Sequence, residues 1–559
     1  MAHTHWKILP ESDKPLAYKG VDALVARLLY NRGVLNSSDA EIFLKADKRL
    51  SIDPFTIPDM HPAVSRVYKA LMSGEKIAVY GDFDADGITA TALLVQGLSA
   101  LGADVVPYIP HRLHEGYGLK IGALEKLRKE GVTLVITVDT GITAFEEIER
   151  SHKMGMEILV TDHHVPLQEL PSAKIIVNPK RSDPATSFID FAGVGVAFKL
   201  LQALLSGTSR EDLLNSSLEL VTLGTITDMS PLLNENRYLV KSGLQILNKT
   251  KRVGLVELMK CAGIDQSKLT TETISYQIGP RLNSAGRLDD AGTSYQLLVT
   301  QDHAQAKSLA MELEEKNKER QRIVAETYDK VRRQIVEDGV DRPILWASDA
   351  DYQSGVMGLV AGKLTDEFYR PVILIKIGSE TCRGSGRSIP EFDLMAALKS
   401  CYHLLTRYGG HARAAGFNLH TRDLQQVQKR LSVLAGEQLT GLDLRPHINI
   451  DAEVPLAAFS KGVFDDIRHL EPFGIDNPAP VFLSRKVEVV EQKLVGSQND
   501  HIKLKLKQDG IVWDTMGFRL GGYVGELGRH IDIVYCVEVD NFNGRGQLRL
   551  NLLDFSRSY

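Results

Sequence analysis

Short apolar runs alternate with longer helical patterns between about Ile77 and Leu233. The runs rich in β-forming residues are KIAVYGDFD, VTLVITVDTG, EILVTDHH and KIIVNP, and the first is followed by the helical stretch ITATALLVQGLSALG. This alternation is typical of βαβ units and predicts a mostly parallel sheet. Several of the runs end in turns rich in Gly, Asp or His. Because ligands of open α/β sheets bind beyond the carboxyl ends of the strands, we expect these polar residues to gather at one edge.

The pattern changes twice after this block. Ala304 to Glu337 is highly charged and contains no proline, which predicts a long, mainly solvated helix that bridges two domains. A second α/β block follows, with PILWASD and PVILIKIG as strands and VMGLVAGKLTDEF as the helix between them. From Asp451 to Tyr559 the chain is rich in short strand patterns, including HIKLKLK and an NFNGRGQ hairpin turn between DIVYCVEVD and LRLNLLDF. A small barrel such as an OB-fold fits this last part best.

The chain of 559 residues is too long for a single hydrophobic core. We therefore predict two α/β domains, the first with a parallel sheet, joined by a long helix and followed by a C-terminal all-β, OB-like barrel. The predicted parts are an N-terminal segment at 1–50, a first α/β domain at 51–300, a connecting helix at 301–340, a second α/β domain at 341–440 and the barrel at 445–559.

Composition narrows the class of protein. Hydrophobic residues make up 43% of the chain and charged residues 25%, which is ordinary for a globular protein. With a formal net charge of −5, a nucleic-acid partner must be held by local basic patches and metal ions. The four cysteines are far apart and lack metal-ligand spacing, which predicts free thiols and argues against structural zinc. There is no signal-like N-terminus and no apolar stretch of ~18 residues, so we expect a cytoplasmic protein without a membrane partner.

The motif GDFDADG carries three aspartates at alternate positions, directly after the apolar run that ends at Tyr80. If the extended backbone persists, Asp82, Asp84 and Asp86 point the same way. A helix is expected to begin at Ile88. Carboxylates that close together repel one another unless a divalent cation neutralises them, so the motif predicts a metal site. An acidic turn that caps a helix is the alternative; an EF-hand loop fails because a strand precedes the motif and no Glu stands at the twelfth position.

Three further motifs supply oxygen and imidazole ligands. They contain Asp139 in VDTGI, Asp162, His163 and His164 in TDHH, and Asp228 in GTITDMSPL. This donor set suits manganese or magnesium.

Several motifs together resemble a known family. In this order, D-x-D after a strand, VDTGI, TDHH and GTxxD resemble the four motifs of the DHH phosphoesterase superfamily. RGSGRS at 383–388 and YGGHARAAGF at 408–417 resemble the associated DHHA1 domain. HRLHEGYGL at 111–119 and GPRLNSAGRLDDA at 279–291 resemble the RecJ exonuclease branch in particular. The resemblance spans roughly residues 77–553.

The resemblance implies a ligand set for two Mn²⁺ or Mg²⁺ ions. Two such ions about 3.5–4 Å apart would activate water for in-line attack on phosphorus and stabilise the departing oxygen, so the implied reaction is phosphodiester hydrolysis. The direct ligands would be Asp84, Asp86, Asp139, His163 and Asp228, with Asp139 able to bridge the two ions. Asp82 and His164 would give close support, and His164 would act as an acid or hold the nucleophile. Asp162 is expected to orient His163 rather than to bind metal. Many relatives have a His where Tyr80 stands here, so Asp82, His164 or water would take that ligand position.

Basic residues in glycine-rich turns are predicted to bind phosphate, because backbone N–H groups and Arg side chains suit phosphate oxygens. The candidates are Ser385, Arg387, His411 and Arg413 in the second block, with Arg281 and Arg287 in the preceding motif. The resemblance implies that Arg112, Arg281, Ser385 and Arg387 hold the 5′-terminal phosphate of the substrate. GVGV at 193–196 opens a helix, where close packing against the sheet is favoured over phosphate contact.

In the barrel, the alternation of HIKLKLK places Lys503, Lys505 and Lys507 on one face of a strand. This stripe is either a solvated sheet face or an electrostatic groove for single-stranded DNA. The residues that could add stacking or phosphate contacts to such a groove are Phe518, Tyr523, Phe542 and Arg545.

By resemblance, the chain is a single-stranded-DNA-specific 5′–3′ exonuclease that releases 5′-mononucleotides in recombination and repair. Single-strand binding protein and a helicase are the expected partners. An oligoribonuclease or nucleotide phosphatase of the same superfamily is the first alternative, but such relatives are shorter and lack the GPRLNSAGR motif and the barrel. A pyrophosphatase would leave the barrel without a purpose. A non-catalytic, DNA-binding replication-scaffold relative would have lost the acidic motifs, which are intact here.

Overall fold

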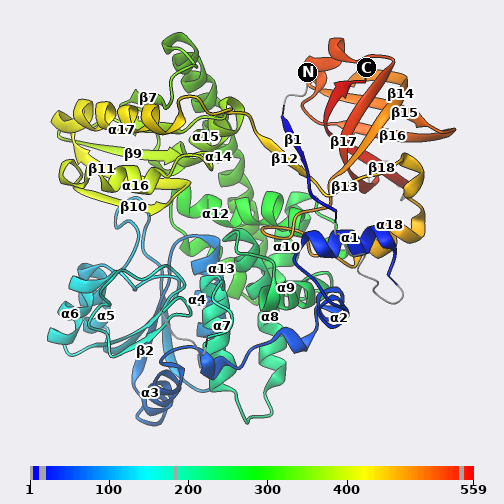
Figure 1. Ribbon diagram of the computed structural model, residues 1–559. Helices are drawn as coiled ribbons and strands as arrows, with labels where there is room; N and C mark the ends of the chain where they lie inside the picture. Colours follow the sequence, from blue (N-terminus) through cyan, green and yellow to red (C-terminus); the bar gives the residue numbers. More distant parts are fainter. Residues whose placement is uncertain (1–3, 12–20, 182–185, 541–546, 559) are drawn as a thin grey trace. The chain divides into compact units, whose positions relative to one another are not determined.

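The computed structural model describes residues 4–11, 21–181, 186–540 and 547–558 (Figure 1). Contacts within the chain divide it into two compact units. One unit combines Met1–Ser51, Pro231–Lys241 and Arg445–Tyr559, and the other combines Ile52–Ser230 and Ser242–Leu444. Two α/β sheets belong to the second unit, and the β-barrel belongs to the first.

The first sheet has five parallel strands in the order β3-β2-β4-β5-β6. The strands are β2 (Lys76–Tyr80), β3 (Asp104–Tyr108), β4 (Val132–Thr137), β5 (Glu157–Thr161) and β6 (Ile175–Val177). The three central strands are buried along nearly their whole length, as apolar runs are when helices cover both faces of a parallel sheet. The predicted parallel sheet is confirmed, and the carboxyl ends of its strands meet at one edge.

Helices cover both faces of this sheet (Figure 1). On one face, α5 (Ile121–Lys129) and α6 (Phe145–Lys153) contribute Leu124 and Ile148 to a core cluster with Val135 and Ile158 of the strands. On the other face lie α4 (Ala85–Ala100) and α7 (Gly193–Leu204), with α8 (Glu211–Thr227) packed beside them and α3 (Met60–Met72) near β6. Since α4 and α7 are connected to the carboxyl ends of strands, their N-termini lie at the edge where the polar motifs gather.

A run of helices leads from the first sheet to the second. Its members are α9 (Asn234–Leu247), α10 (Val253–Ala262), α11 (Thr271–Thr273), a π-helical turn (Ile274–Ile278), α12 (Gly279–Leu288), α13 (Gly292–Val299) and α14 (His303–Asp338). The long helix predicted from the charge pattern is α14. Its buried positions, such as Ala306, Ala310 and Leu313, recur at helical spacing, so one face packs while charged residues cover the rest.

The second sheet has the strand order β10-β11-β9-β8-β7, in which only β7 and β8 run parallel. Its strands are β7 (Leu345–Asp349), β8 (Val372–Lys376), β9 (Thr381–Arg387), β10 (Arg407–His411) and β11 (Ala414–His420). Helix α15 (Ser354–Phe368) covers one face, and α16 (Leu394–Lys399) and α17 (Leu424–Leu439) cover the other. Both predicted strands and the helix between them are confirmed.

The glycine-rich motifs of this domain are strands, not the turns that the sequence predicted. RGSGRS lies mostly on β9, and YGGHARAAGF forms the β10–β11 hairpin, where only the tip is a turn. The two glycines of β9 are required for packing: a Cβ on Gly384 would lie 2.3 Å from the ring of Phe417, and one on Gly386 would lie 2.6 Å from Leu394. Glycine thus permits close approach within a sheet here, a role that composition alone cannot distinguish from a turn.

The barrel unit is built from five long strands that close through a β14–β17 pairing. The strands are β14 (Phe482–Val495), β15 (His501–Gln508), β16 (Ile511–Gly517), β17 (His530–Asp540) and β18 (Gln547–Arg557), with the short β13 (Ala452–Glu453) beside β14. Inward-facing residues such as Ile502, Leu504 and Leu506 form its core. The predicted all-β barrel is confirmed. The NFNGRGQ turn between β17 and β18 lies outside the described residues, apart from its last position.

The N-terminal segment packs onto the same unit as the barrel. Strand β1 (His5–Ile8) pairs in parallel with β12 (His447–Ile450), and α1 (Ala23–Asn31), α2 (Ser37–Lys45) and α18 (Lys461–Arg468) surround the core. Arg237 is fully buried and donates hydrogen bonds to the carbonyls of Phe43 and Leu470, so it ties three chain segments together. None of the helices in the described part of the chain combines the length and the apolar character that crossing a bilayer requires.

Candidate metal centre

Asp84 follows strand β2 and begins helix α4. Its carboxylate accepts hydrogen bonds from the backbone N–H groups of Asp86 and Gly87 at 3.0 and 3.2 Å, so it is the N-cap residue. The helix therefore begins at Ala85, not at Ile88 as predicted, and the extended backbone stops before Asp86. The helix begins earlier than the alternating aspartates predict, because a cap at Asp84 satisfies backbone N–H groups that the first helical turn leaves without partners.

Asp86 lies in the first turn of α4 and points to the start of α7. Its two carboxylate oxygens accept hydrogen bonds from the backbone N–H groups of Gly193 and Val194 at 2.6 and 2.8 Å. Gly193 packs against Asp139, where a Cβ would lie 2.5 Å from the aspartate's own Cβ. Close packing was the prediction for GVGV and is found, but the contact is with Asp139 rather than with the sheet. The helix N-terminus also holds a carboxylate, which the sequence analysis missed.

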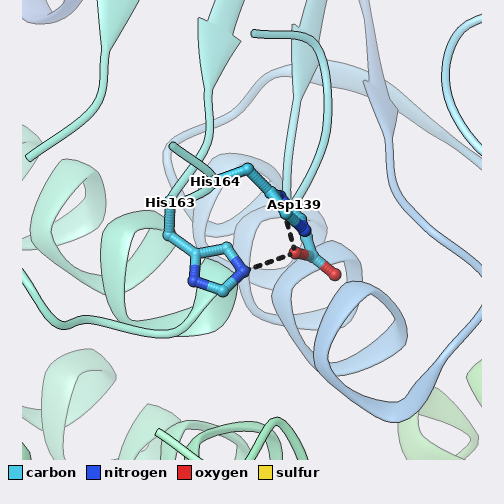
Figure 2. Close-up of side chains that lie close together, drawn as sticks. All are labelled: Asp139, His163 and His164. Carbon is cyan, nitrogen blue, oxygen red and sulfur yellow. Dashed lines mark ion pairs between the residues drawn. The ribbon is translucent and has the colours of Figure 1, made fainter. Parts of the chain in front are cut away.

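The acidic and imidazole side chains converge into overlapping groups. The ligand atoms within each group lie within 4.8 Å of one another, and the groups are Asp82–Asp84–Asp139, Asp86–His163–Asp228 and Asp139–His163–His164. Figure 2 shows the imidazole of His163 directed at the Asp139 carboxylate, with Nε2 3.0 Å from Oδ1. Asp139 adopts a left-handed backbone with φ 59°, a conformation that Asp tolerates better than most residues. All seven residues predicted for the catalytic centre are therefore brought together.

Asp162 supports this cluster from behind, but differently from the prediction. Its carboxylate accepts the N–H groups of Ile142 and His163 and the ring Nδ1–H of His164 at 2.8 Å. It therefore orients the ring of His164, not that of His163, whose Nδ1 instead lies 3.0 Å from the carbonyl oxygen of Phe191.

Tyr80, which stands where many relatives have a His, is fully buried within the first α/β domain. Its hydroxyl donates a hydrogen bond to the carbonyl oxygen of Gly118, and its ring stacks on Tyr108. The neighbouring Tyr117 reaches the cluster instead, with its hydroxyl 3.3 Å from His164 Nδ1.

Arginines surround the carboxylates on the side of the second sheet. Arg112 lies over the ring of Phe83, and it is a charged neighbour of Asp82, Arg287 and Arg387. Ser385 and Arg387 pack against Gly358 of α15, where a Cβ would lie 2.9 Å from Arg387 Nη2 and 3.2 Å from Ser385 Oγ. These contacts place the predicted phosphate-binding residues of both domains beside one another.

Three of the predicted phosphate ligands are placed differently. Arg281 forms a 2.6 Å ion pair with Glu314 of α14, so its guanidinium already has an anionic partner. The ring of His411 lies 6.3 Å from that of His164, on the metal side of the hairpin. Arg413 lies at the hairpin tip, next to the exposed end of β10.

Comparison with known proteins covers nearly the whole chain. The family models "DHH family, N-terminal domain", "DHHA1 domain" and "RecJ OB domain" match residues 76–225, 341–437 and 450–554. The chain is 36% identical to the single-stranded-DNA-specific exonuclease RecJ of Bacillus subtilis (strain 168), over 98% of this chain and 70% of that protein. It is 32% identical to RecJ of Dickeya dadantii (strain 3937), over 94% of this chain and 95% of that protein. The chain belongs to the RecJ family.

Solved RecJ structures share the fold. RecJ from Thermus thermophilus in complex with Mn²⁺ has a TM-score of 0.86 and 29% identity, over 99% of this chain and 80% of that chain. A second structure, exonuclease RecJ bound to manganese, covers 69% of this chain and 98% of its own with a TM-score of 0.60 and 35% identity. The expected arrangement of DHH, DHHA1 and OB domains is thus the one found.

The buried carboxyl groups of the RecJ-type centre need a cation to be ionised together. Burial, together with the negative charge of the neighbouring Asp84, raises the pKa of Asp82 to about 8. Burial, and then the negative charges of the other aspartates, raises the pKa of Asp139 well above its usual value. Burial likewise raises the pKa of Asp228 to about 6. Among the described residues, Oδ1 of Asp82 is buried without a hydrogen-bond partner, and Nε2 of His163 is buried beside the Asp139 carboxylate without a hydrogen bond. Oxygen and imidazole donors without thiolate fit Mn²⁺ or Mg²⁺.

The two histidines of the RecJ-type motif differ in charge. Burial, and then the positive charge of His164, lowers the pKa of His163 to about 3, so its ring is neutral and able to bind a metal. Burial opposes charging of His164 as well, but its ion pair with Asp162 outweighs burial and raises the pKa of His164 to about 9. His164 is therefore the cation of the pair at neutral pH.

The sequence analysis missed residues whose contribution is a backbone contact. Asn283 of the RecJ-like GPRLNSAGR motif accepts a hydrogen bond from the N–H of Ala85 at 2.8 Å, and so fixes the start of α4 beside Asp84. The Gly193 and Val194 N–H groups that hold Asp86 were also missed. Membership of the GPRLNSAGR motif was the one signal that could have pointed to Asn283, whereas nothing in the residue types of GVGV pointed to a carboxylate.

Replacing Asp82 with Asn tests whether this carboxyl is protonated in the metal-free protein. The folded-state pKa of about 8 lies above the unfolded value of about 3.9, so the unfolded state releases the proton first and stability falls as pH rises from about 4 to 8. The Asp82→Asn variant has no carboxyl group at this position to titrate, so it should not lose this stability as pH rises. We expect its melting temperature in EDTA, relative to wild type, to rise by roughly 2 °C or more between pH 5 and pH 8.

Asp104→Asn, at an exposed position of the same sheet, is the matched control and should show a nearly constant difference from wild type. Equal pH slopes for wild type and Asp82→Asn would contradict the prediction.

Proposed function

We propose that this chain is a metal-dependent exonuclease specific for single-stranded DNA, which hydrolyses phosphodiester bonds from the 5′ end and releases 5′-mononucleotides. The observation that carries the proposal is the convergence of Asp82, Asp84, Asp86, Asp139, His163, His164 and Asp228 in a chain that matches RecJ exonucleases along nearly its full length. The oligoribonuclease and pyrophosphatase alternatives do not account for the RecJ OB domain at 450–554.

The metal ligands are assigned to two groups. Asp84 and Asp139, with Asp82 close by, would hold one Mn²⁺ or Mg²⁺ ion, and Asp86, His163 and Asp228 would hold the second, with Asp139 within reach of both. Bound there, the ions supply Lewis acidity to the scissile phosphate and to its attacking water. Ser230 donates a hydrogen bond to the Asp228 carboxylate, and α7 fixes Asp86, so two of the ligands are oriented before any metal arrives.

His164 is assigned an electrostatic role. Asp162 holds its Nδ1–H, and its charge at neutral pH leaves the other ring N–H as a donor toward a phosphate oxygen. The same proton can pass to the departing oxygen, so His164 serves as the acid. Tyr117 and His411 flank its ring and limit its movement.

The 5′-terminal phosphate is assigned to Arg112, Ser385 and Arg387. Burial, and then the charge of Arg112, lowers the pKa of Arg387, which is what two arginines facing one anion site would experience before the anion binds. Arg281 is a further candidate, provided that it exchanges Glu314 for phosphate. Arg413 at the hairpin tip and His411 are assigned to the strand beyond the cleaved bond.

The barrel is assigned to sequence-independent binding of the DNA backbone, but its lysines are not equivalent. Lys505 forms a 2.7 Å ion pair with Glu491 and stands opposite Asp514 on β16, so its charge is largely neutralised. Lys503 stands opposite Lys493, and neither has a carboxylate within ion-pair distance among the described residues. Lys507 stands opposite Glu488, but that carboxylate pairs with Arg529, and Lys507 has no carboxylate within ion-pair distance among the described residues. The DNA contact is therefore assigned to Lys503 and Lys507. The candidates Phe518 and Tyr523 are partly exposed, whereas Phe542 and Arg545 lie outside the described residues.

The RecJ resemblance also supports single-strand binding protein and an unwinding helicase as partners in recombination and repair. We also propose that the enzyme acts in the cytoplasm, where it would meet a DNA substrate.

Removing a metal ligand should abolish hydrolysis. Asp84→Ala, Asp139→Ala and His163→Ala are each expected to lower turnover in manganese by at least ~100-fold, because even residues that merely orient ligands are worth 10- to 100-fold. Turnover of 5′-labelled single-stranded DNA, with metal content and circular dichroism measured on the same samples, checks this. Near-normal turnover in any metal-loaded variant would remove that residue from the ligand set.

End recognition should depend on the shape of Arg387 as well as its charge. Wild type should degrade a strand blocked at its 3′ end and spare one blocked at its 5′ end. Arg387→Ala should reduce the preference for a 5′-phosphate over a 5′-hydroxyl about tenfold or more, since a charge-assisted hydrogen bond contributes ~1.5–3 kcal/mol. Arg387→Lys keeps the charge but loses the bidentate geometry, so it should recover only part of the preference.

Equal degradation of the two blocked strands would overturn the polarity. An unchanged phosphate preference in Arg387→Ala would move end recognition to Arg112 and Arg281.

The barrel lysines should set the salt dependence of binding to long strands. In an Asp84→Ala background, Lys503→Gln with Lys507→Gln should reduce the slope of log affinity against log salt by up to ~1.4, about 0.7 for each lost phosphate contact. Lys505→Gln, whose charge is already paired, should leave the slope nearly unchanged. If the double variant behaves like Lys505→Gln, the stripe is a solvated sheet face.

A further inference from the structure

Four strands of the second sheet carry polar side chains at one register level. Lys376 on β8 stands opposite Arg383 on β9, which stands opposite Asn418 on β11, and Asn418 stands opposite Arg407 on β10. Directly opposite residues of paired strands share a face of the sheet. These four residues therefore form one line, called the cation row below. With ~4.8 Å between neighbouring strands, the cation row is about 14 Å long.

The cation row shares its face with the residues assigned to the 5′-phosphate. Arg383, Ser385 and Arg387 alternate along β9 and project from one side, while the positions of Cys382, Gly384 and Gly386 lie on the buried side. The row is thus displaced along β9 from the proposed end-binding group, by two residues from Ser385.

One end of the cation row is linked to the metal centre through Tyr117, and a pocket lies at the other end. Arg407 Nη2 donates a hydrogen bond to the carbonyl oxygen of Tyr117 at 3.1 Å, and the Tyr117 hydroxyl lies beside His164. At the far end is a pocket of about 220 Å³, lined by Lys376, Gly378, Thr381, Cys382, Arg383 and Asn418.

Two glycines leave part of the sheet surface next to the row without side chains. Gly409 and Gly416 stand opposite each other on β10 and β11, two residues from Arg407 and Asn418, and both are exposed. A Cβ on Gly409 would meet no atom within 4 Å, and one on Gly416 would meet only a carbonyl oxygen at 3.8 Å. Neither position therefore needs glycine for packing against this protein, and the absence of side chains leaves room for another chain to lie close to the backbone.

In the part of the chain that the structure describes, the cations of the row lack anionic partners. Among the described residues, Lys376, Arg383 and Arg407 have no carboxylate within ion-pair distance, unlike Arg281 with Glu314. Burial, with the charges of Arg112 and Arg407, also lowers the pKa of Arg383, so cations here repel one another. Like charges gathered beside a bare surface and a pocket suit a ligand that carries several negative charges.

We infer that the cation row is a second phosphate-binding subsite, which holds an internucleotide phosphate of the strand on the far side of the cleaved bond from the 5′ end. The inference rests on the proposed function. A stacked nucleotide advances ~3.4 Å along a strand, so a row of about 14 Å reaches phosphates beyond the one at the metal centre. Arg407 lies next to the cleaved bond, and Arg383 and Lys376 hold the phosphate that enters the pocket.

The test compares substrates that do and do not have a phosphate beyond the cleaved bond. A 5′-phosphorylated thymidine dinucleotide has only its end phosphate and the scissile one, whereas a 5′-phosphorylated dodecamer has more. Lys376→Gln combined with Arg383→Gln should lower kcat/KM for the dodecamer about tenfold or more, mainly through KM, and change kcat/KM for the dinucleotide less than twofold. The matched control is Lys399→Gln combined with Lys429→Gln, which removes the same charge from exposed positions of α16 and α17 on the opposite face. It should match wild type on both substrates.

The outcomes separate this inference from the proposed function. If wild type degrades neither substrate, the proposed function is wrong. If wild type degrades both and the Lys376/Arg383 variant matches the control, the row binds no phosphate and the inference is wrong. A third arm uses a dodecamer with a 5′-triphosphate. A loss confined to that substrate would overturn the assignment to an internucleotide phosphate, because the extra phosphates would then lie at the 5′ end.

Discussion

Repulsion among buried carboxylates is the constraint on which this structure depends. Asp82, Asp86 and Asp139 are each at most 4% exposed, and their ligand atoms belong to overlapping groups only a few ångströms across. Bare anions so placed are costly, since burial and mutual repulsion both oppose ionisation. The fold relieves part of the cost with the two N–H groups that open α7 and with the positive charge of His164. The remainder requires divalent cations, so the same arrangement that strains the metal-free protein gives it metal affinity.

Helix α12 fixes the distance between the metal centre and the arginines of the second sheet. Asn283 on this helix accepts the N–H that opens α4, and a Cβ on Gly286 would lie 2.6 Å from the Phe83 carbonyl oxygen. On its other side, Arg287 Nη1 donates to the carbonyl of Gly355 at the start of α15, where a Cβ would lie 2.1 Å from the Arg287 carbonyl. Helix α12 thus contacts both α/β domains at glycines, which let the two backbones approach closely. The residues of GPRLNSAGR are explained by this double packing as much as by phosphate binding.

The sequence could predict the elements and the membership of the site, but not the local backbone of its motifs. Apolar runs identify buried strands because burial on both faces demands them, and the acidic motifs converge because parallel strands end at one edge. The predicted start of α4 is wrong because the alternating pattern assumes an extended backbone. The extended backbone ends at Asp84, since this Asp caps the helix that follows. Glycines such as Gly384 do not form the predicted turns, since their function is set by Phe417, a residue more than thirty positions away on the neighbouring strand. The partner of Asp162 depends on ring orientation, which no spacing encodes.

The charge distribution couples metal loading to DNA binding. The chain as a whole carries a formal charge of −5, so nothing at long range attracts a polyanion. Near the site, however, Arg112 stands beside Asp82 and Arg287 beside Asp84, and Arg383 and Arg387 are charged neighbours of Arg112. Without cations, the aspartates that stay ionised offset these arginines and repel a phosphate directly. Divalent cations reverse the sign of the centre and leave the arginines as the dominant field. Because such coupling is reciprocal, a phosphate placed at the centre must strengthen metal binding by the same factor as metal strengthens the binding of the strand.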